Sequence, residues 1–186
     1  MPHIELESHL PGITGLLEYR KDTGQPIRDL TQILMRGQST LSEAERELIA
    51  TIVSHGNQCR FCTTAHAAAA DLYLGEKTTT QKMRDDIEST PVSEKMKALL
   101  TIAAAVGKNG KLVTPEMVTR AKSAGATDPE IHDTVLIAAL FSLYNRYVDG
   151  MATAMPDNDA YFDTLADRLV NHGYSRLPQG YDHLKK

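Results

Sequence analysis

The sequence predicts an all-α protein, and three observations support that prediction. Apolar residues recur at helical spacing, and no stretch alternates with the period of two that a strand requires. Capping signals bound the apolar stretches. The chain has no Trp and only 5% aromatic residues, which suits closely packed helices better than a sheet. We therefore expect the 186 residues to form a single helical domain.

The first elements follow from proline, glycine and capping residues. Residues 1–25 contain both proline and glycine and are expected to form an amino-terminal arm. A helix is expected from about Pro26, because proline suits the first helical position. Ser42 and Glu45 form a capping-box pattern at the start of the next helix. A further helix follows and is expected to end at Gly75.

The later helices have similar signals. Thr114-Pro115-Glu116 and Asp128-Pro129-Glu130 each combine a cap, a proline and an acidic residue in the first turn. Residues from about 173–186 are expected to form an irregular tail. The expected helices span about residues 26–36, 42–55, 58–74, 80–88, 93–106, 115–123, 129–150 and 158–171.

One predicted helix bears on assembly. Residues 131–148, "IHDTVLIAALFSLYNRYV", are apolar on nearly every side. Such a helix lies at the centre of a fold or is covered by another subunit. Because the expected core consists mainly of alanine and leucine, we favour a homo-oligomer.

Charge and hydropathy exclude several classes of partner. The net charge of −4 and the absence of a Lys/Arg cluster give no attraction to nucleic acid. No apolar segment reaches membrane-spanning length, and "MPHIELESHLPG" lacks the features of a secretory signal. We therefore expect a cytoplasmic protein whose thiols are kept reduced. In that compartment a single pair of cysteines is more often catalytic or metal-binding than a permanent crosslink.

Both cysteines lie in the stretch "NQCRFCTTAH". On a helix with Cys59 at zero, Cys62 lies at about 300° and His66 at about 340°, so all three share one face. The helix amino terminus is expected to lower a thiol's pKa there. A disulfide between residues three apart would constrain the fold little. Such a crosslink is better explained as one that forms and breaks, which favours redox chemistry. Two alternatives stay open: a zinc site completed by His55, and thiols that only pack.

Glu47, Cys59, Cys62 and His66 form the pattern E-x(11)-C-x-x-C-x(3)-H. This pattern resembles that of the alkylhydroperoxidase AhpD-like / carboxymuconolactone decarboxylase-like family. The stretches "LPGITGLL", "LSEAERELIATIVSHGNQCRFCTTAH" and "LYNRYVDG" are similar to its peroxidase-related branch, and the resemblance covers about residues 10–174. It implies an AhpD-like helical bundle that assembles into homo-oligomers.

The resemblance also implies roles for the four residues. Cys62 would attack a hydroperoxide, Cys59 would resolve the product or donate a proton, and Glu47 and His66 would form a proton relay. The spacing alone leaves open which cysteine attacks. The implied function is a thiol-dependent alkylhydroperoxide reductase or thiol–disulfide oxidoreductase, an antioxidant enzyme reduced by an external lipoyl- or thioredoxin-like dithiol. No metal, flavin or haem is expected, and the sequence has no dinucleotide-binding fingerprint.

The secondary candidates are His55, Asn145 and Arg146. Phe61 stands where the best-known members of the family carry a second histidine, and His55 is a candidate substitute for that histidine. Asn145 and Arg146 interrupt an apolar helix near its end and are candidates to line the pocket or a subunit interface.

Two other functions remain open at this stage. A carboxymuconolactone decarboxylase-like lyase would use His66 as its acid–base catalyst and leave the cysteines incidental. A non-enzymatic helical module would use the same residues as a zinc site or a redox switch.

Overall fold

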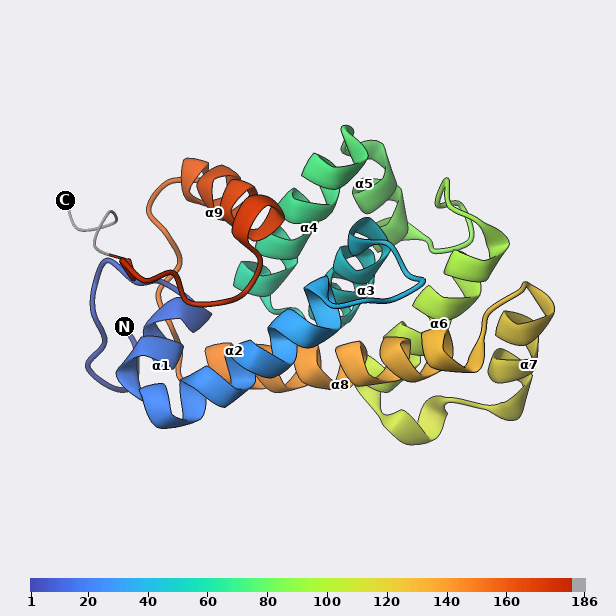
Figure 1. Cartoon of the computed structure of the whole chain (residues 1–186), viewed down its shortest axis with the longest axis horizontal. Coiled ribbons are helices and arrows are strands. Elements are labelled where there is room, and N and C mark those ends of the chain that lie inside the picture. Colours follow the sequence, from blue (N-terminus) through green and yellow to red (C-terminus); the bar gives the residue numbers. More distant parts are fainter. Residues whose placement is uncertain (182–186) are drawn as a thin grey trace.

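The computed structural model describes residues 1–181, and this part of the chain contains nine α-helices, one short 3₁₀ helix and no strand (Figure 1). The all-α prediction is confirmed. The helices are α1 (Ile13–Tyr19), α2 (Lys21–Arg36), α3 (Glu43–Gly56), α4 (Arg60–Leu74), α5 (Thr78–Asp85), α6 (Glu94–Lys108), η1 (Gly110–Leu112), α7 (Pro115–Ser123), α8 (Asp128–Gly150) and α9 (Ala160–His172).

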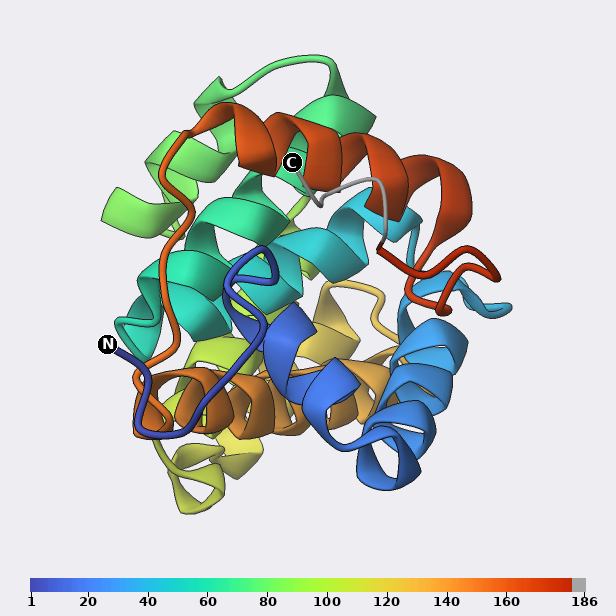
Figure 2. The same cartoon turned by 90° about the vertical axis from the view of Figure 1, so that its left-hand side faces the viewer.

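The pair α3 and α4 forms the centre of the molecule. The two helices are joined by residues 57–59 and pack against each other along their lengths. Helix α3 also contacts α6 and α8, and α4 is covered on its other side by α9 (Figure 2). Helix α7 packs at the far end, against α6 and α8.

Two of the three buried clusters among the described residues bear on the site. The main core lies between α3, α6 and α8 and includes Ile49, Leu99 and Phe141. A smaller cluster lies where α4, α8 and α9 meet, and it contains both cysteines. Its buried members are Cys59, Phe61, Cys62, Ala65, Val148 and Phe162. The thiols are therefore inside the protein, at a junction of three helices.

The amino-terminal region contains more helix than predicted. Helix α1 lies within the expected arm of residues 1–25, and α2 begins at Lys21 rather than at Pro26. Asp22 lies in the first turn of α2, where its carboxylate accepts a hydrogen bond from the Thr23 backbone N–H at 3.0 Å. The stretch before Pro26 is thus a stabilised first turn, and the proline lies inside the helix.

The amino-terminal segment covers the cysteine-containing cluster. The Gly12 backbone N–H donates to the Ala154 carbonyl at 3.1 Å. Gly12 has a φ of +59°, and a Cβ atom placed on it would lie 2.3 Å from the Phe61 ring. Only glycine fits both the backbone conformation and this close approach.

The carboxyl-terminal tail is irregular between residues 173 and 181, as predicted, and it folds back onto the helices. The remaining residues of the expected tail, 182–186, lie outside the described part of the chain. Among residues 1–181, none of the helices combines the length and the apolar character that crossing a bilayer needs.

Candidate functional site

The amino terminus of α4 differs from the prediction in one important detail. Gln58 has a φ of +61°, so the helix cannot continue through it and begins at Arg60. Cys59 is the residue before the helix, with an extended backbone, and its N–H donates to the Ser54 carbonyl at 3.0 Å. Cys59 is therefore the cap of the helix and not, as was expected, a residue within it, and its carbonyl still accepts the Thr63 N–H at 2.9 Å.

The two thiols are free and buried, with exposed fractions of 0% for Cys59 and 2% for Cys62. They nevertheless interact, because the Cys62 side chain is hydrogen-bonded to those of Cys59 and Asn145. Cys62 and His66 line a common pocket, and Cys59 lies outside its lining. The structure therefore separates one thiol that faces a cavity from one that lies behind it.

The Cys62 thiol lies in the first turn of α4, but its pKa is not lowered there. The neighbouring Cys59 thiol and burial together raise the pKa of Cys62 well above its usual range, although the bond to Asn145 opposes them. The expected lowering of this pKa is thus wrong, because the neighbouring thiol and burial both raise it. Cys62 needs a base to remove its proton at neutral pH.

A candidate base is present in the same pocket. The predicted contact between Glu47 and His66 is confirmed: Glu47 Oε2 lies 2.7 Å from His66 Nδ1. The Glu47 side chain is completely buried, although it belongs to a polar residue type that is mostly exposed. Since an ionised carboxylate can only accept, the hydrogen lies on Nδ1 and the His66 Nε2 atom is left as an acceptor.

Two residues that the sequence analysis did not single out hold Glu47. Arg36 Nη2 donates to Glu47 Oε1 at 2.6 Å, and the Tyr174 hydroxyl donates to the same oxygen at 2.6 Å. Burial alone would raise the pKa of Glu47, but the bonds and charges of His66 and Arg36, with the Tyr174 bond, outweigh it and keep this pKa below its usual value.

The imidazole ring is held by aromatic contacts as well. The Phe141 ring meets the His66 ring edge-on, with 4.4 Å between centroids. The Tyr174 ring lies nearly parallel to His66, at 6.1 Å and an interplanar angle of 15°. Together with the Glu47 bond, these contacts fix both the tautomer and the orientation of His66.

The secondary candidates separate into one that reaches the thiols and two that do not. Asn145 is 1% exposed and donates through Nδ2 to Ser54 Oγ at 3.0 Å, in addition to its bond with Cys62. Arg146 is exposed and bonds to the Ser142 carbonyl of its own helix. His55 is exposed as well, and neither it nor Arg146 lines the pocket.

The candidate zinc ligands are not gathered into one site. His55 lies on the surface, whereas Cys59, Cys62 and His66 are buried. Within residues 1–181, no group of three or more His, Cys, Asp or Glu side chains is arranged to hold a metal ion.

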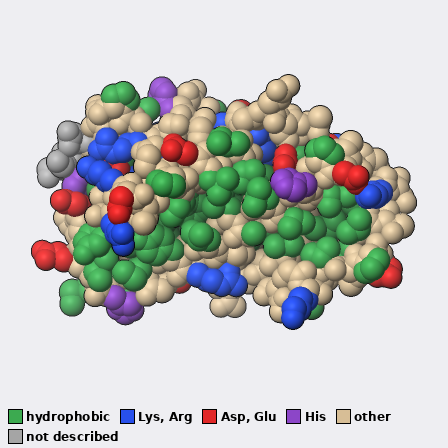
Figure 3. Space-filling view, turned by 60° about the horizontal axis from the view of Figure 1, so that its bottom comes forward, with side chains coloured by type: hydrophobic (Ala, Val, Ile, Leu, Met, Phe, Trp, Pro, Cys, Tyr) green, Lys and Arg blue, Asp and Glu red, His purple; other side chains and the backbone are tan. Residues whose placement is uncertain are grey.

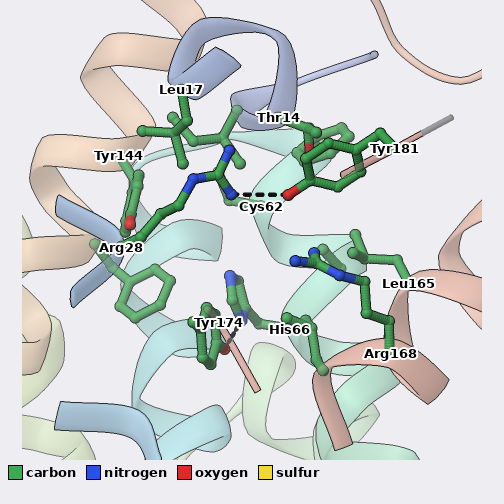
Figure 4. Close-up of a pocket in the computed structure, with 15 residues that line it drawn as sticks. Thr14, Leu17, Arg28, Cys62, His66, Tyr144, Leu165, Arg168, Tyr174 and Tyr181 are labelled. Carbon is green, nitrogen blue, oxygen red and sulfur yellow. Dashed lines mark hydrogen bonds between the residues drawn. The ribbon is translucent and has the colours of Figure 1, made fainter. Parts of the chain in front are cut away.

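The pocket itself is a small, mostly apolar cavity of about 60 Å³ (Figure 4). By the volume that one water occupies, it has room for roughly four waters or one small organic molecule. Its lining comes from α1, α2, α4, α8, α9 and the carboxyl-terminal tail. The lining residues are Ile13, Thr14, Leu17, Arg28, Phe61, Cys62, Ala65, His66, Phe141, Tyr144, Leu165, Arg168, Leu169, Tyr174 and Tyr181.

Comparisons with known proteins agree with this arrangement. Residues 22–71 match the model of the carboxymuconolactone decarboxylase family. The matched segment includes Arg36, Glu47, both cysteines and His66, whereas Tyr174 lies outside it. No curated protein matches the chain at a significant level.

Solved structures with the same fold are of AhpD-like proteins. An uncharacterized peroxidase-related protein from Silicibacter sp. TM1040 is 25% identical, with a TM-score of 0.74 over 82% of this chain and 78% of that one. The alkylhydroperoxidase AhpD core of an uncharacterized peroxidase-related protein from Ralstonia eutropha JMP134 is 24% identical, with a TM-score of 0.75 over 84% and 80%. A protein of unknown function from Agrobacterium tumefaciens, proposed to be an AhpD antioxidant defence protein, is 19% identical, with a TM-score of 0.66 over 77% and 97%.

Proposed function

Because residues 22–71 match the carboxymuconolactone decarboxylase family and the fold is that of AhpD-like peroxidase-related proteins, we propose that this chain is a thiol-dependent hydroperoxide reductase. The observation that carries the proposal is the pocket shared by a thiol and an imidazole, where Cys62 and His66 meet and Glu47 fixes the ring. This is the arrangement of a nucleophile, a base and a group that orients the base.

The reaction follows from these three groups. His66 Nε2 takes the Cys62 proton, and the thiolate attacks the terminal oxygen of a hydroperoxide, which breaks the O–O bond. The sulfur becomes a sulfenic acid, and the departing alkoxide takes a proton and leaves as an alcohol. The Cys59 thiol then condenses with the sulfenic acid, forming a disulfide and releasing water. An external dithiol supplies the two electrons and two protons that restore both thiols.

The structure supports Cys62 rather than Cys59 as the attacking residue. Cys62 faces the cavity beside His66, whereas Cys59 lies behind it and is fully buried. A peroxide in the pocket would meet the Cys62 sulfur first. The interaction between the two side chains supports the choice of Cys59 as the resolving thiol.

Peroxide treatment followed by thiol counting and peptide mass analysis tests the proposal. One equivalent of a small hydroperoxide should consume both thiols and link Cys59 to Cys62 in a single peptide. The Cys59→Ser variant should stop at a sulfenic acid on Cys62, which a dimedone label detects by mass. Two unmodified thiols after peroxide treatment of the wild-type protein would refute the mechanism.

We also propose that the protein forms a homo-oligomer. Hydrophobic side chains gather in a band along one face of the molecule (Figure 3). The exposed large apolar residues of α2 and α8 are Leu30, Ile33 and Leu143, with exposed fractions of 41%, 66% and 45%. Sedimentation of the wild-type protein and of Ile33→Glu tests this assembly; a monomeric wild-type protein would contradict it.

The match to the carboxymuconolactone decarboxylase family favours a second candidate function. In a lyase of that kind, His66 would act as the acid–base catalyst and the thiols would play no part. Replacing both cysteines by serine distinguishes the two functions. Peroxide reduction requires the sulfur atoms and should disappear, whereas decarboxylation should persist.

A further inference from the structure

The pocket contains a positive charge that the proposed reaction does not use. Arg168 extends from α9 into the pocket, on the same side as Tyr181 and near His66 (Figure 4). Its Nη2 donates to the Ser175 carbonyl at 3.1 Å. Its Nε is buried and has no hydrogen-bond partner. Within the described residues, no carboxylate lies within ion-pair distance of this guanidinium.

The other two arginines that face this region are ion-paired, although Arg28 shares the Glu18 carboxylate with Arg176. Arg28 Nη2 donates to Glu18 Oε1 at 2.8 Å, and Arg28 Nη1 donates to the Tyr181 hydroxyl at 2.7 Å. Arg36 is paired with Glu47. A buried N–H without a partner is rare in folded proteins, because its desolvation is not offset by a hydrogen bond.

Both pocket arginines also lie close to the Tyr181 ring. The Cζ atoms of Arg168 and Arg28 lie 5.0 and 5.6 Å from the centre of the Tyr181 ring. No Asp or Glu of residues 1–181 belongs to the pocket lining. An apolar cavity whose guanidinium has no carboxylate partner among residues 1–181 favours a ligand with one negative charge.

From these observations we infer that the pocket binds small hydroperoxides that carry a carboxylate, and that Arg168 binds the carboxylate. The guanidinium offers a planar set of N–H donors that match the two carboxylate oxygens. The peroxide end of the same molecule then faces Cys62 and His66, and the apolar lining surrounds the short carbon chain between them. The cavity of about 60 Å³ is smaller than a five-carbon acid such as 3-methylbutanoate, so entry of that acid requires the lining side chains to move apart. The predicted substrate preference rests on the proposed peroxide reduction, whereas the predicted binding of a carboxylate does not.

A pair of matched substrates tests the kinetic part. 3-Hydroperoxy-3-methylbutanoate and tert-butyl hydroperoxide share the reacting group, and only the first carries a carboxylate. We expect the wild-type protein to prefer the carboxylated peroxide in kcat/KM by at least tenfold. Arg168→Met should abolish this preference, measured as the ratio of kcat/KM for the two peroxides within the same protein. Arg168→Lys keeps the charge and should retain part of the preference.

The binding part needs no peroxide. 3-Methylbutanoate and its neutral analogue 3-methylbutanamide are titrated into the protein, and binding is followed by the NMR shifts of their methyl groups. We expect the carboxylate to bind at least tenfold more tightly than the amide, and we expect Arg168→Met to remove the difference. Arg120→Met, which removes an exposed arginine of α7 outside the pocket, should retain it.

The outcomes separate the two proposals. If tert-butyl hydroperoxide is reduced but the carboxylate gives no advantage in rate or binding, the anion site is wrong and the peroxidase proposal stands. If 3-methylbutanoate binds through Arg168 but no peroxide is reduced, the anion site stands and the peroxidase proposal fails. Thermal melting of Arg168→Met shows whether a loss of binding reflects unfolding. An unchanged preference in a folded Arg168→Met protein would also overturn the inference.

Discussion

Replacing Glu47 by glutamine tests the proton relay most directly. The substitution keeps the size of the side chain and removes its charge. In the wild-type protein, the carboxylate accepts from His66 Nδ1 at 2.7 Å and from Arg36 and Tyr174 at 2.6 Å each. An amide oxygen can still accept the Arg36 and Tyr174 bonds, which both fall on Oε1, but an amide cannot stabilise the imidazolium that forms when His66 takes a proton.

The magnitude follows from those contacts. A hydrogen bond to a charged group contributes about 1.5–3 kcal/mol, so losing the charge beside His66 should slow peroxide attack about 10- to 100-fold. The same change leaves the Arg36 guanidinium without its counter-ion, although its side chain is only 6% exposed. Breaking such a buried pair typically costs about 3–5 kcal/mol of folding free energy. Glu47→Gln is therefore expected to react more slowly and also to be less stable than the wild-type protein.

Stopped-flow measurement of Cys62 oxidation, with urea unfolding in parallel, separates the two effects. Glu130→Gln is the matched control, because Glu130 is a buried carboxylate paired with Lys95 at 2.7 Å and does not line the pocket. The control should lose stability and keep its rate of oxidation. Glu47→Gln should lose both. A folded Glu47→Gln protein that is oxidised at the wild-type rate would show that the carboxylate has no part in the reaction.

Three further predictions concern protonation and the tail. Because the pKa of Cys62 is raised, its alkylation by iodoacetamide should accelerate about tenfold per pH unit from pH 7 to 9, and a plateau below pH 8 would contradict this. Tyr174→Phe removes one bond to Glu47 and should slow peroxide attack about 3- to 10-fold in a protein that melts within a few degrees of wild type; an unchanged rate would argue against a role for the tail. Burial opposes ionisation of Glu130, but the Lys95 and Thr127 bonds lower its pKa to about 2. Since this pKa lies below that of the unfolded chain, the Glu130 carboxylate stabilises the fold fully above about pH 4.5. This stabilisation, about 3 kcal/mol, is lost as the pH falls toward 2. Urea unfolding should therefore show a difference in unfolding free energy between wild type and Glu130→Gln that shrinks in acid.

Local signals and the family pattern together predicted much of the site. Capping patterns at Ser42 and Thr114 mark real helix starts, and each side chain accepts a backbone hydrogen bond in the structure. The family pattern paired Glu47 with His66, and the structure brings these two side chains into contact.

The features that were missed depend on distant parts of the chain. Tyr174 lies in an irregular segment 127 residues from Glu47, where no periodicity indicates which side chains point inward. Arg36 ends a helix, where a cation is favoured by the helix dipole whether or not it has another role. The position of Cys59 depends on the left-handed backbone of Gln58, a conformation that the residue type does not predict.

The burial of Cys59 also constrains how an oxidised site could be restored. In a Cys59–Cys62 disulfide, the Cys59 sulfur would be closed off by protein on every side, and only the Cys62 sulfur would be open to an incoming thiolate. The reducing partner would therefore become linked to Cys62, with Cys59 as the leaving group. Mass analysis of Cys59→Ser trapped with a partner dithiol should place the adduct on Cys62.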